Sequence, residues 1–235
     1  MSAGESFGSS IHNTLKRFGE LEMKLSGMNK PEKPLQLFTE ESAHDLPSEL
    51  TLTMLLTLWR QCFIAEGYAN RAEMDMKLLQ GERALTHFFH WWKKQTRTVV
   101  CIEKSFKFPV NEGKDMLSGR FDRIEKNETG LHIIDFKSSS PRNPETLTTD
   151  LQLSVYTLAA RELWPEPVAS LSLLFVTEDG IAEQRTTKSE SQLKDALTTI
   201  RLLSERIASK DFAATPSKEK CLYCPYRNIC PFRTA

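Results

Sequence analysis

Three consecutive segments rich in β-forming residues constrain the fold of this chain more than any other feature. They cover residues 98–108, 115–126 and 131–137, and the sequence NETG separates the second from the third. A short segment containing Asn and Gly between two strand candidates predicts a hairpin, so these strands are expected to be antiparallel neighbours. A chain built around such a unit is not all-helical.

Segments with helical periodicity lie on both sides of these strands. The spacing of apolar residues predicts a helix over 8–25 and two or three helices between 48 and 95, with Gly67 and Gly81 as candidate breaks. Farther along, the pattern predicts a helix over 147–163, strands over 168–177 and 181–187, and a closing helix over 189–210. This order predicts an α/β (α+β) protein with a mixed central β-sheet flanked by helices.

We expect one domain over residues 1–235, with a helical part at 8–95, a core at 98–210 and a Cys-rich tail at 216–235. No apolar run reaches the roughly 18 residues of a membrane span, and the N-terminus lacks a secretory pattern, so a cytoplasmic protein with no membrane partner is predicted. The 31 basic and 31 acidic residues cancel. This balance excludes a polycation but allows a local basic groove.

The sequence IIDFK at residues 133–137 places two charged side chains in an otherwise apolar strand. Asp135 and Lys137 project from the same side of that strand, where burial is costly without a partner or a function. The hairpin would bring Asp122 of the preceding strand within reach of the same ion as Asp135. Two carboxylates suit Mg²⁺, and a neighbouring lysine can stabilise developing negative charge, as metal-assisted phosphodiester hydrolysis requires. The alternative is a surface Asp–Lys pair on an edge strand.

Further short motifs accompany these charged residues. GSSIH occupies residues 8–12, VVCIE residues 99–103 and DLQLSVY residues 150–156. Gln152 and Tyr156 are four residues apart and therefore share a helix face. In this order, the motifs resemble those of the PD-(D/E)XK nuclease superfamily, and more narrowly the branch with the RecB-type nuclease domain and the CRISPR-associated adaptation exonucleases.

The resemblance extends from Gly8 to Cys230 and implies a restriction-endonuclease-like fold with an N-terminal helical insertion. It implies these roles: metal binding for His12, Asp122 and Asp135, catalysis for Lys137, and support of the site with DNA contact for Gln152 and Tyr156. Glu103 matches a recurrent strand acid, and the resemblance assigns it no role. The alternatives are a packed helix-edge histidine at position 12 and a core tyrosine at position 156.

Three cysteines lie in the sequence CLYCPYRNICP, residues 221–231. Cys221, Cys224 and Cys230 at this spacing indicate a metal site, because a soft ion stabilises neighbouring thiolates. The spacing resembles the C-terminal part of the iron–sulfur staple of this nuclease branch, where a fourth cysteine lies upstream. No cysteine precedes His12, and Cys62 and Cys101 are expected in the core. A [4Fe–4S] cluster would thus be incomplete here, with zinc as the competing ion, and we expect the chain to be a piece truncated at its N-terminus.

The sequence therefore predicts a deoxyribonuclease dependent on Mg²⁺ or Mn²⁺, with exonuclease action expected, in DNA repair, recombination or processing. DNA is its predicted partner, together with a helicase domain or subunit. The alternatives are a non-catalytic DNA-binding module of nuclease fold within a helicase–nuclease, and a small interaction domain in which only the cysteine tail matters.

Overall fold

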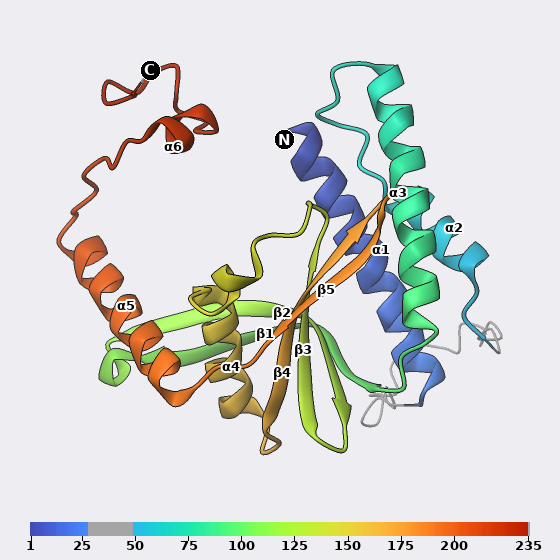
Figure 1. The fold of residues 1–235 in the computed structure, drawn as a ribbon, viewed down its shortest axis with the longest axis horizontal. Helices are drawn as coiled ribbons and strands as arrows, with labels where there is room; N and C mark the ends of the chain where they lie inside the picture. Colours follow the sequence, from blue (N-terminus) through green and yellow to red (C-terminus); the bar gives the residue numbers. More distant parts are fainter. Residues whose placement is uncertain (28–48, 235) are drawn as a thin grey trace, which may run out of the picture.

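The computed structural model describes residues 1–27 and 49–234, and its centre is one mixed β-sheet (Figure 1). The strand order is β1-β2-β3-β4-β5. Its strands are β1 (Thr98–Val110), β2 (Asp115–Asn127), β3 (Gly130–Lys137), β4 (Val168–Thr177) and β5 (Gly180–Thr186). Only β3 and β4 are parallel, and the NETG segment forms the expected hairpin between β2 and β3. The predicted mixed sheet is confirmed.

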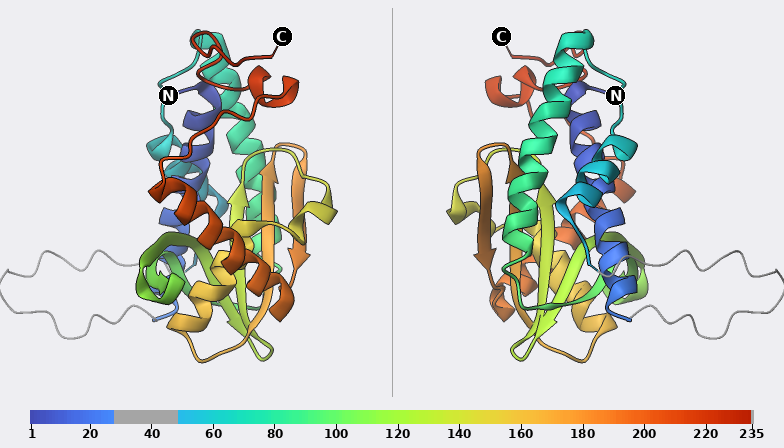
Figure 2. Two further views of the ribbon diagram at one scale, coloured as in Figure 1. Left: turned by 90° about the vertical axis from the view of Figure 1, so that its left-hand side faces the viewer. Right: turned by 90° about the vertical axis from the view of Figure 1, so that its right-hand side faces the viewer.

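Helices cover both faces of this sheet (Figures 1 and 2). They are α1 (Ala3–Leu25), α2 (Leu52–Cys62), α3 (Arg71–Trp92), α4 (Leu151–Leu163), α5 (Glu190–Ala208) and α6 (Lys218–Leu222). Helices α1 to α3 pack on one face, while α4 and α5 lie on the other. Within the described ranges, no helix combines the length and apolarity that crossing a membrane requires.

The apolar run in β3 follows from its position between the two layers. Ile133 belongs to the cluster under α4, whereas Ile134 and Phe136 belong to the cluster under α1 to α3. Because successive side chains in a strand point to opposite faces, a strand covered on both faces must be apolar at consecutive positions. Asp135 is therefore a carboxylate within a doubly covered strand, and it is 2% exposed.

Helix α1 begins at Ala3, earlier than the predicted start at residue 8. The Ser2 hydroxyl accepts a hydrogen bond from the Glu5 N–H, and the Glu5 carboxylate accepts one from the Ser2 N–H. This capping box satisfies the free amides of the first turn, so the helix starts there and Gly8 lies inside it. A Cβ on Gly8 would lie 3.1 Å from the Ser138 hydroxyl, which shows how closely α1 approaches the end of β3.

Gly81 does not break a helix, contrary to the sequence-based expectation. Helix α3 runs through it, and a Cβ at this position would lie 2.1 Å from the indole ring of Trp59. Helices α2 and α3 thus come into contact at Gly81, where a larger side chain would clash with Trp59. Gly67 does lie in the connection between α2 and α3, with a φ of +87° that favours glycine.

Helix α4 begins at Leu151, after the predicted start at residue 147. A short 3₁₀ segment, Pro144–Leu147, precedes it, and the Asp150 carboxylate accepts a hydrogen bond from the Leu153 N–H at 3.0 Å. The buried ammonium of Lys188 donates to the carbonyl oxygens of Leu147, Thr148 and Asp150. These bonds fix the turn from which α4 extends toward the end of β3.

Candidate metal centre and active site

The pairing of β1 with β2 is irregular at Glu103. The residue lies between the pairs Ile102↔Arg123 and Lys104↔Phe121, opposite Asp122. Its φ is 51°, in the left-handed region that non-glycine residues rarely adopt. Such a conformation costs on the order of 1–3 kcal/mol and tends to occur at functional sites.

Three side chains from three different elements meet at this irregularity. His12 of α1, Glu103 of β1 and Asp122 of β2 each offer a ligand atom, and these atoms lie within 4.8 Å of one another. His12 Nδ1 is 3.4 Å from Asp122 Oδ2. His12 and Asp122 are predicted ligands, whereas the family resemblance assigns Glu103 no role. The only sequence signal for Glu103 was its motif, since a left-handed backbone conformation at a single strand residue leaves no composition pattern.

Asp135 lies beside this group, and side chains of α4 and β3 hold it. Its Oδ1 accepts a hydrogen bond from Gln152 Nε2 at 3.0 Å and lies 3.0 Å from the Tyr156 hydroxyl. Lys137 Nζ is 2.6 Å from Oδ2, although the angle does not suit a hydrogen bond. Among the described residues, Oδ2 therefore has no hydrogen-bond donor. Lys137 also donates to Gln152 Oε1 at 3.4 Å, so four of the predicted residues form one connected set.

Tyr156 is both a core residue and a side chain that supports the site, the two roles that the sequence left open. Its ring is packed in the apolar cluster, with its centroid 5.2 Å from that of Phe121. Its hydroxyl lies 3.0 Å from both Asp135 Oδ1 and the Arg120 carbonyl oxygen, so its one proton can be donated to either. Burial, followed by the nearby charge of Asp135, raises the pKa of this hydroxyl well above its usual range. Tyr156 therefore stays a neutral donor.

Burial and the Asp135 charge together raise the pKa of Asp122 to about 6, against the lowering effect of His12 and of the Phe136 N–H. Among the described residues, Lys137 is the ammonium beside the Asp135 carboxylate, and the Asp135 oxygen that it approaches accepts no hydrogen bond. Carboxylate oxygens and an imidazole fit a divalent ion, with oxygen-rich sets preferred by hard cations. His12, Glu103 and Asp122 would hold it, with Asp135 adjacent.

The cysteine tail does not form a comparable centre. In the described ranges, the sulfur atoms of Cys221, Cys224 and Cys230 are not gathered within 4.8 Å, as the ligand atoms at His12 are. Hydrogen bonds from the Thr234 backbone and side chain do lower the pKa of the Cys221 thiol. Burial raises the pKa of Cys101 to about 11, as expected for a core thiol.

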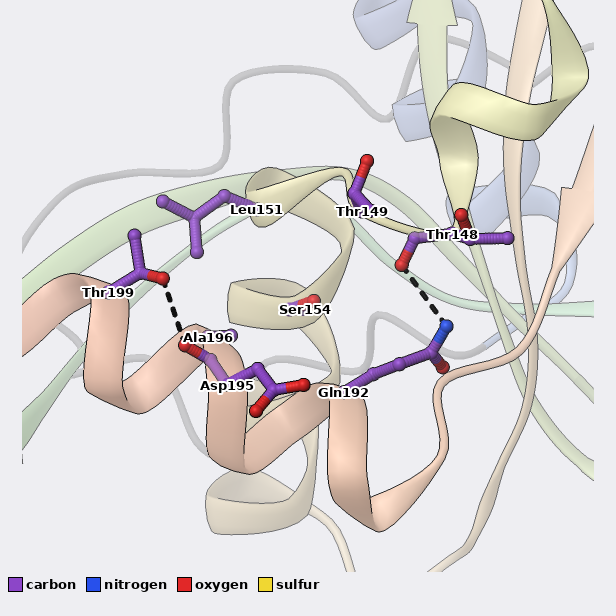
Figure 3. A pocket seen from close by; sticks show the side chains of 8 residues that line it. All are labelled: Thr148, Thr149, Leu151, Ser154, Gln192, Asp195, Ala196 and Thr199. Carbon is purple, nitrogen blue, oxygen red and sulfur yellow. Dashed lines mark hydrogen bonds between the residues drawn. The ribbon is translucent and has the colours of Figure 1, made fainter.

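A cavity of about 240 Å³ lies between α4 and α5 (Figure 3). Thr148, Gln192 and Thr199 are among its lining residues, and Gln192 Nε2 donates to the Thr148 carbonyl oxygen at 3.2 Å. None of the predicted site residues lines it. It belongs to the packing of α5 against α4.

The mixed sheet with helices on both faces, the paired acids and the adjacent lysine define a nuclease of the restriction-endonuclease-like class. Residues 1–231 match the model of the PD-(D/E)XK nuclease superfamily, and the chain belongs to this family. It is accordingly a metal-dependent DNA nuclease.

Comparison with individual proteins gives a more specific likeness. The CRISPR-associated exonuclease Cas4 of Francisella tularensis subsp. novicida (strain U112) is 24% identical over 187 residues, which cover 75% of this chain and 91% of that protein. This similarity supports the adaptation-exonuclease-like branch. The crystal structure of SSO0001 covers 96% of this chain and 86% of that chain, at 17% identity and a TM-score of 0.44.

Proposed function

We propose that this protein is a Mg²⁺- or Mn²⁺-dependent exonuclease on DNA. The observation that carries the proposal is the convergence of His12, Glu103 and Asp122 beside Asp135 and Lys137. The similarity to a protein named as an exonuclease supports exonucleolytic rather than internal cleavage. The chemistry supplied by a bound divalent cation is polarisation of the phosphodiester and acidification of water.

The protein side chains have separable roles in this proposal. Glu103, Asp122 and His12 hold the cation, and Asp135 completes the acidic surface toward the phosphate. Gln152 and Tyr156 fix the Asp135 carboxylate through its Oδ1, which leaves Oδ2 beside the Lys137 ammonium. Lys137 places its ammonium where negative charge develops on the phosphate oxygens.

The test is cleavage of end-labelled linear single- and double-stranded DNA with Mg²⁺, with Mn²⁺ and with EDTA. Asp135→Asn and Lys137→Ala should each lower the rate by at least ~10³-fold. Matched changes on α5, Asp195→Asn and Lys194→Ala, should leave it unchanged. If closed circular DNA is not degraded, the result would support an exonuclease. Cleavage of closed circular DNA would overturn the proposal that the enzyme acts from DNA ends.

The second candidate is a non-catalytic DNA-binding module of nuclease fold. The position of Asp135 favours this candidate, because Asp135 is not among the three side chains whose ligand atoms converge, those of His12, Glu103 and Asp122. It predicts tight DNA binding without cleavage in any metal. Near-wild-type cleavage by Asp135→Asn would instead refute the site assignment.

The iron–sulfur cluster, a RecB-like helicase partner and a role in DNA repair rest on the sequence resemblance alone. Iron and sulfide analysis of protein purified without oxygen tests the cluster, with Cys224→Ser and Cys230→Ser as the variants expected to lose iron. Purified protein that contains one zinc ion per chain and no iron would show that the tail binds zinc.

A further inference from the structure

The hairpin of β1 and β2 extends far beyond the part of the sheet that β3 covers (Figure 1). Pairing between β1 and β2 continues to Val110↔Asp115, whereas β3 pairs with β2 only from Arg123 onward. Residues 104–110 and 115–121 therefore form a two-stranded ribbon, which we call the β1–β2 ribbon. One end of it carries Glu103 and Asp122, and the other end is the turn beside α5.

The two faces of the β1–β2 ribbon differ sharply. The inner face is apolar and packs against α4 and α5 through Phe106, Phe108 and Val110, with Phe121 at its end. Gly119 lies opposite Phe106, where a Cβ would be only 2.4 Å from the ring. This close approach lets the aromatic side chain cover β2 and holds the ribbon rigid against its core.

The outer face of the ribbon is exposed and carries positive charge only. The outward pairs are Ser105↔Arg120, Lys107↔Ser118 and Pro109↔Met116, and all six residues are exposed. Two are cationic and none is acidic. In a chain with equal numbers of basic and acidic residues, this is a local excess of positive charge next to the candidate active site.

Arg120 connects this face with the acidic site. Its Nε is 2.6 Å from Glu103 Oε2, and its side chain is 59% exposed while that of Glu103 is 10% exposed. Among the described residues, Glu103 is its ion-pair partner, and the contact lacks hydrogen-bond geometry. A guanidinium has five N–H donors, so Arg120 retains donors for a second anion.

Lys107 is the diagonal cross-strand neighbour of Arg120. Its partner is Ser118, two residues before Arg120 on the same face of β2. Diagonal neighbours of an antiparallel pair lie about 7–8 Å apart, within reach of long side chains. Their charges thus form a short line that leads from the acidic site along the ribbon.

We propose that the outer face of the β1–β2 ribbon binds the backbone of the DNA strand that is cut. This inference rests on the proposed nuclease function. Arg120 contacts the phosphate nearest the acidic site, and Lys107 contacts a phosphate farther along the same strand. Ser105 and Ser118 offer hydroxyl donors between them. These contacts position DNA and read no sequence, because they involve only phosphates.

The test measures DNA binding without cleavage. The probe is a fluorescein-labelled single-stranded oligonucleotide in EDTA, followed by anisotropy at several salt concentrations. Arg120→Gln, Lys107→Gln and the charge-adding Ser118→Glu should each raise Kd several-fold. Each lost phosphate contact should also reduce the slope of log K against log salt by about 1. Circular dichroism melts of Lys107→Gln and Ser118→Glu should match wild type, since these two side chains are exposed.

Lys104→Gln is the matched control. Lys104 is an exposed lysine of the same strand, but strand alternation puts it on the side of Phe106. Its removal should leave Kd within twofold of the wild-type value. An equal loss from Lys104→Gln, or unchanged binding by Lys107→Gln and Ser118→Glu, would overturn the proposal.

The binding test also separates this proposal from the nuclease function. Protein that binds through the ribbon but never cleaves DNA would support the ribbon and reject the exonuclease. Cleavage by the wild-type protein together with normal DNA binding by the ribbon variants would support the nuclease and reject the ribbon. With an active enzyme, Lys107→Gln should raise KM and leave kcat unchanged, as loss of a contact made equally in ground and transition states predicts.

Discussion

The carboxylate of Asp122 accepts a hydrogen bond from the backbone N–H of Phe136 at 2.9 Å. Regular pairing of β2 with β3 ends one step earlier, at Arg123↔Ile134. The side chain thus satisfies a strand amide that the ladder no longer reaches, and it holds Asp122 next to Asp135. Two acids in adjacent strands are fixed near each other by the backbone that carries them.

This arrangement predicts a pH dependence of stability in metal-free protein. The pKa of Asp122 is raised from 3.8 to about 6, so its neutral form favours the folded state, and this contribution is lost as the pH rises through 6. The loss amounts to about 3 kcal/mol between pH 3 and pH 8. In EDTA, Asp122→Asn should therefore be more stable than wild type at pH 8 and close to it at pH 4.

Urea unfolding at both pH values measures that difference. Asp195→Asn is the control and should follow wild type at each pH. If the free energy of unfolding of wild type exceeded that of Asp122→Asn, and by more at pH 8 than at pH 4, the assigned direction of the pKa shift would be contradicted.

Glu103→Gln should weaken metal binding. Removing one of three convergent ligands should raise the Kd for Mn²⁺ by about 10- to 100-fold, the range seen even for groups that only support ligands. Calorimetric titration measures this directly. Glu112 provides a matched control, since it is also a β1–β2 glutamate with positive φ, 58°, but lies at the turn. Equal effects of Glu103→Gln and Glu112→Gln would reject Glu103 as a ligand.

Tyr156→Phe should lower cleavage by about 10- to 100-fold and stability by about 1 kcal/mol, because Asp135 Oδ1 and Gln152 lose a hydrogen-bond partner. Tyr68→Phe is the comparison: the Tyr68 hydroxyl is buried and finds no partner among the described residues. That change should leave activity intact and stability equal or higher. Initial rates and thermal melts distinguish the two.

Arg123→Met should destabilise the fold by about 3–5 kcal/mol, since the guanidinium is 3% exposed and joins Glu22 of α1 to Glu125 of β2, each at 2.7 Å. Its removal takes the ion-pair partner from Glu22 and leaves the buried Glu125 with Arg97 alone. Arg201→Met, which breaks an exposed pair with Glu205 on α5, should cost under about 0.5 kcal/mol. Guanidinium unfolding measures both, and similar values for the two would show that the buried network contributes little.

The sequence predicted the sheet well because its signals are local. Strand alternation, the NETG turn and the helical periods identified every strand and the C-terminal ends of α1 and α4. It missed the starts of α1 and α4, which the Ser2 capping box and the Asp150 cap set. It also predicted a break at Gly81, where the helix continues in close contact with Trp59. Packing against another element leaves no trace in a local pattern.

The sequence alone determined which residue types are available for chemistry: His12, two strand aspartates, Lys137 and the Gln152–Tyr156 pair on one helix face. Only the tertiary structure decided how they are grouped. The irregular pairing at Glu103 adds a third ligand beside His12 and Asp122, while α4 holds Asp135 through its Oδ1. The physical reason is that distances between ligands depend on strand register and helix packing, which are set by long-range contacts rather than by neighbours along the chain.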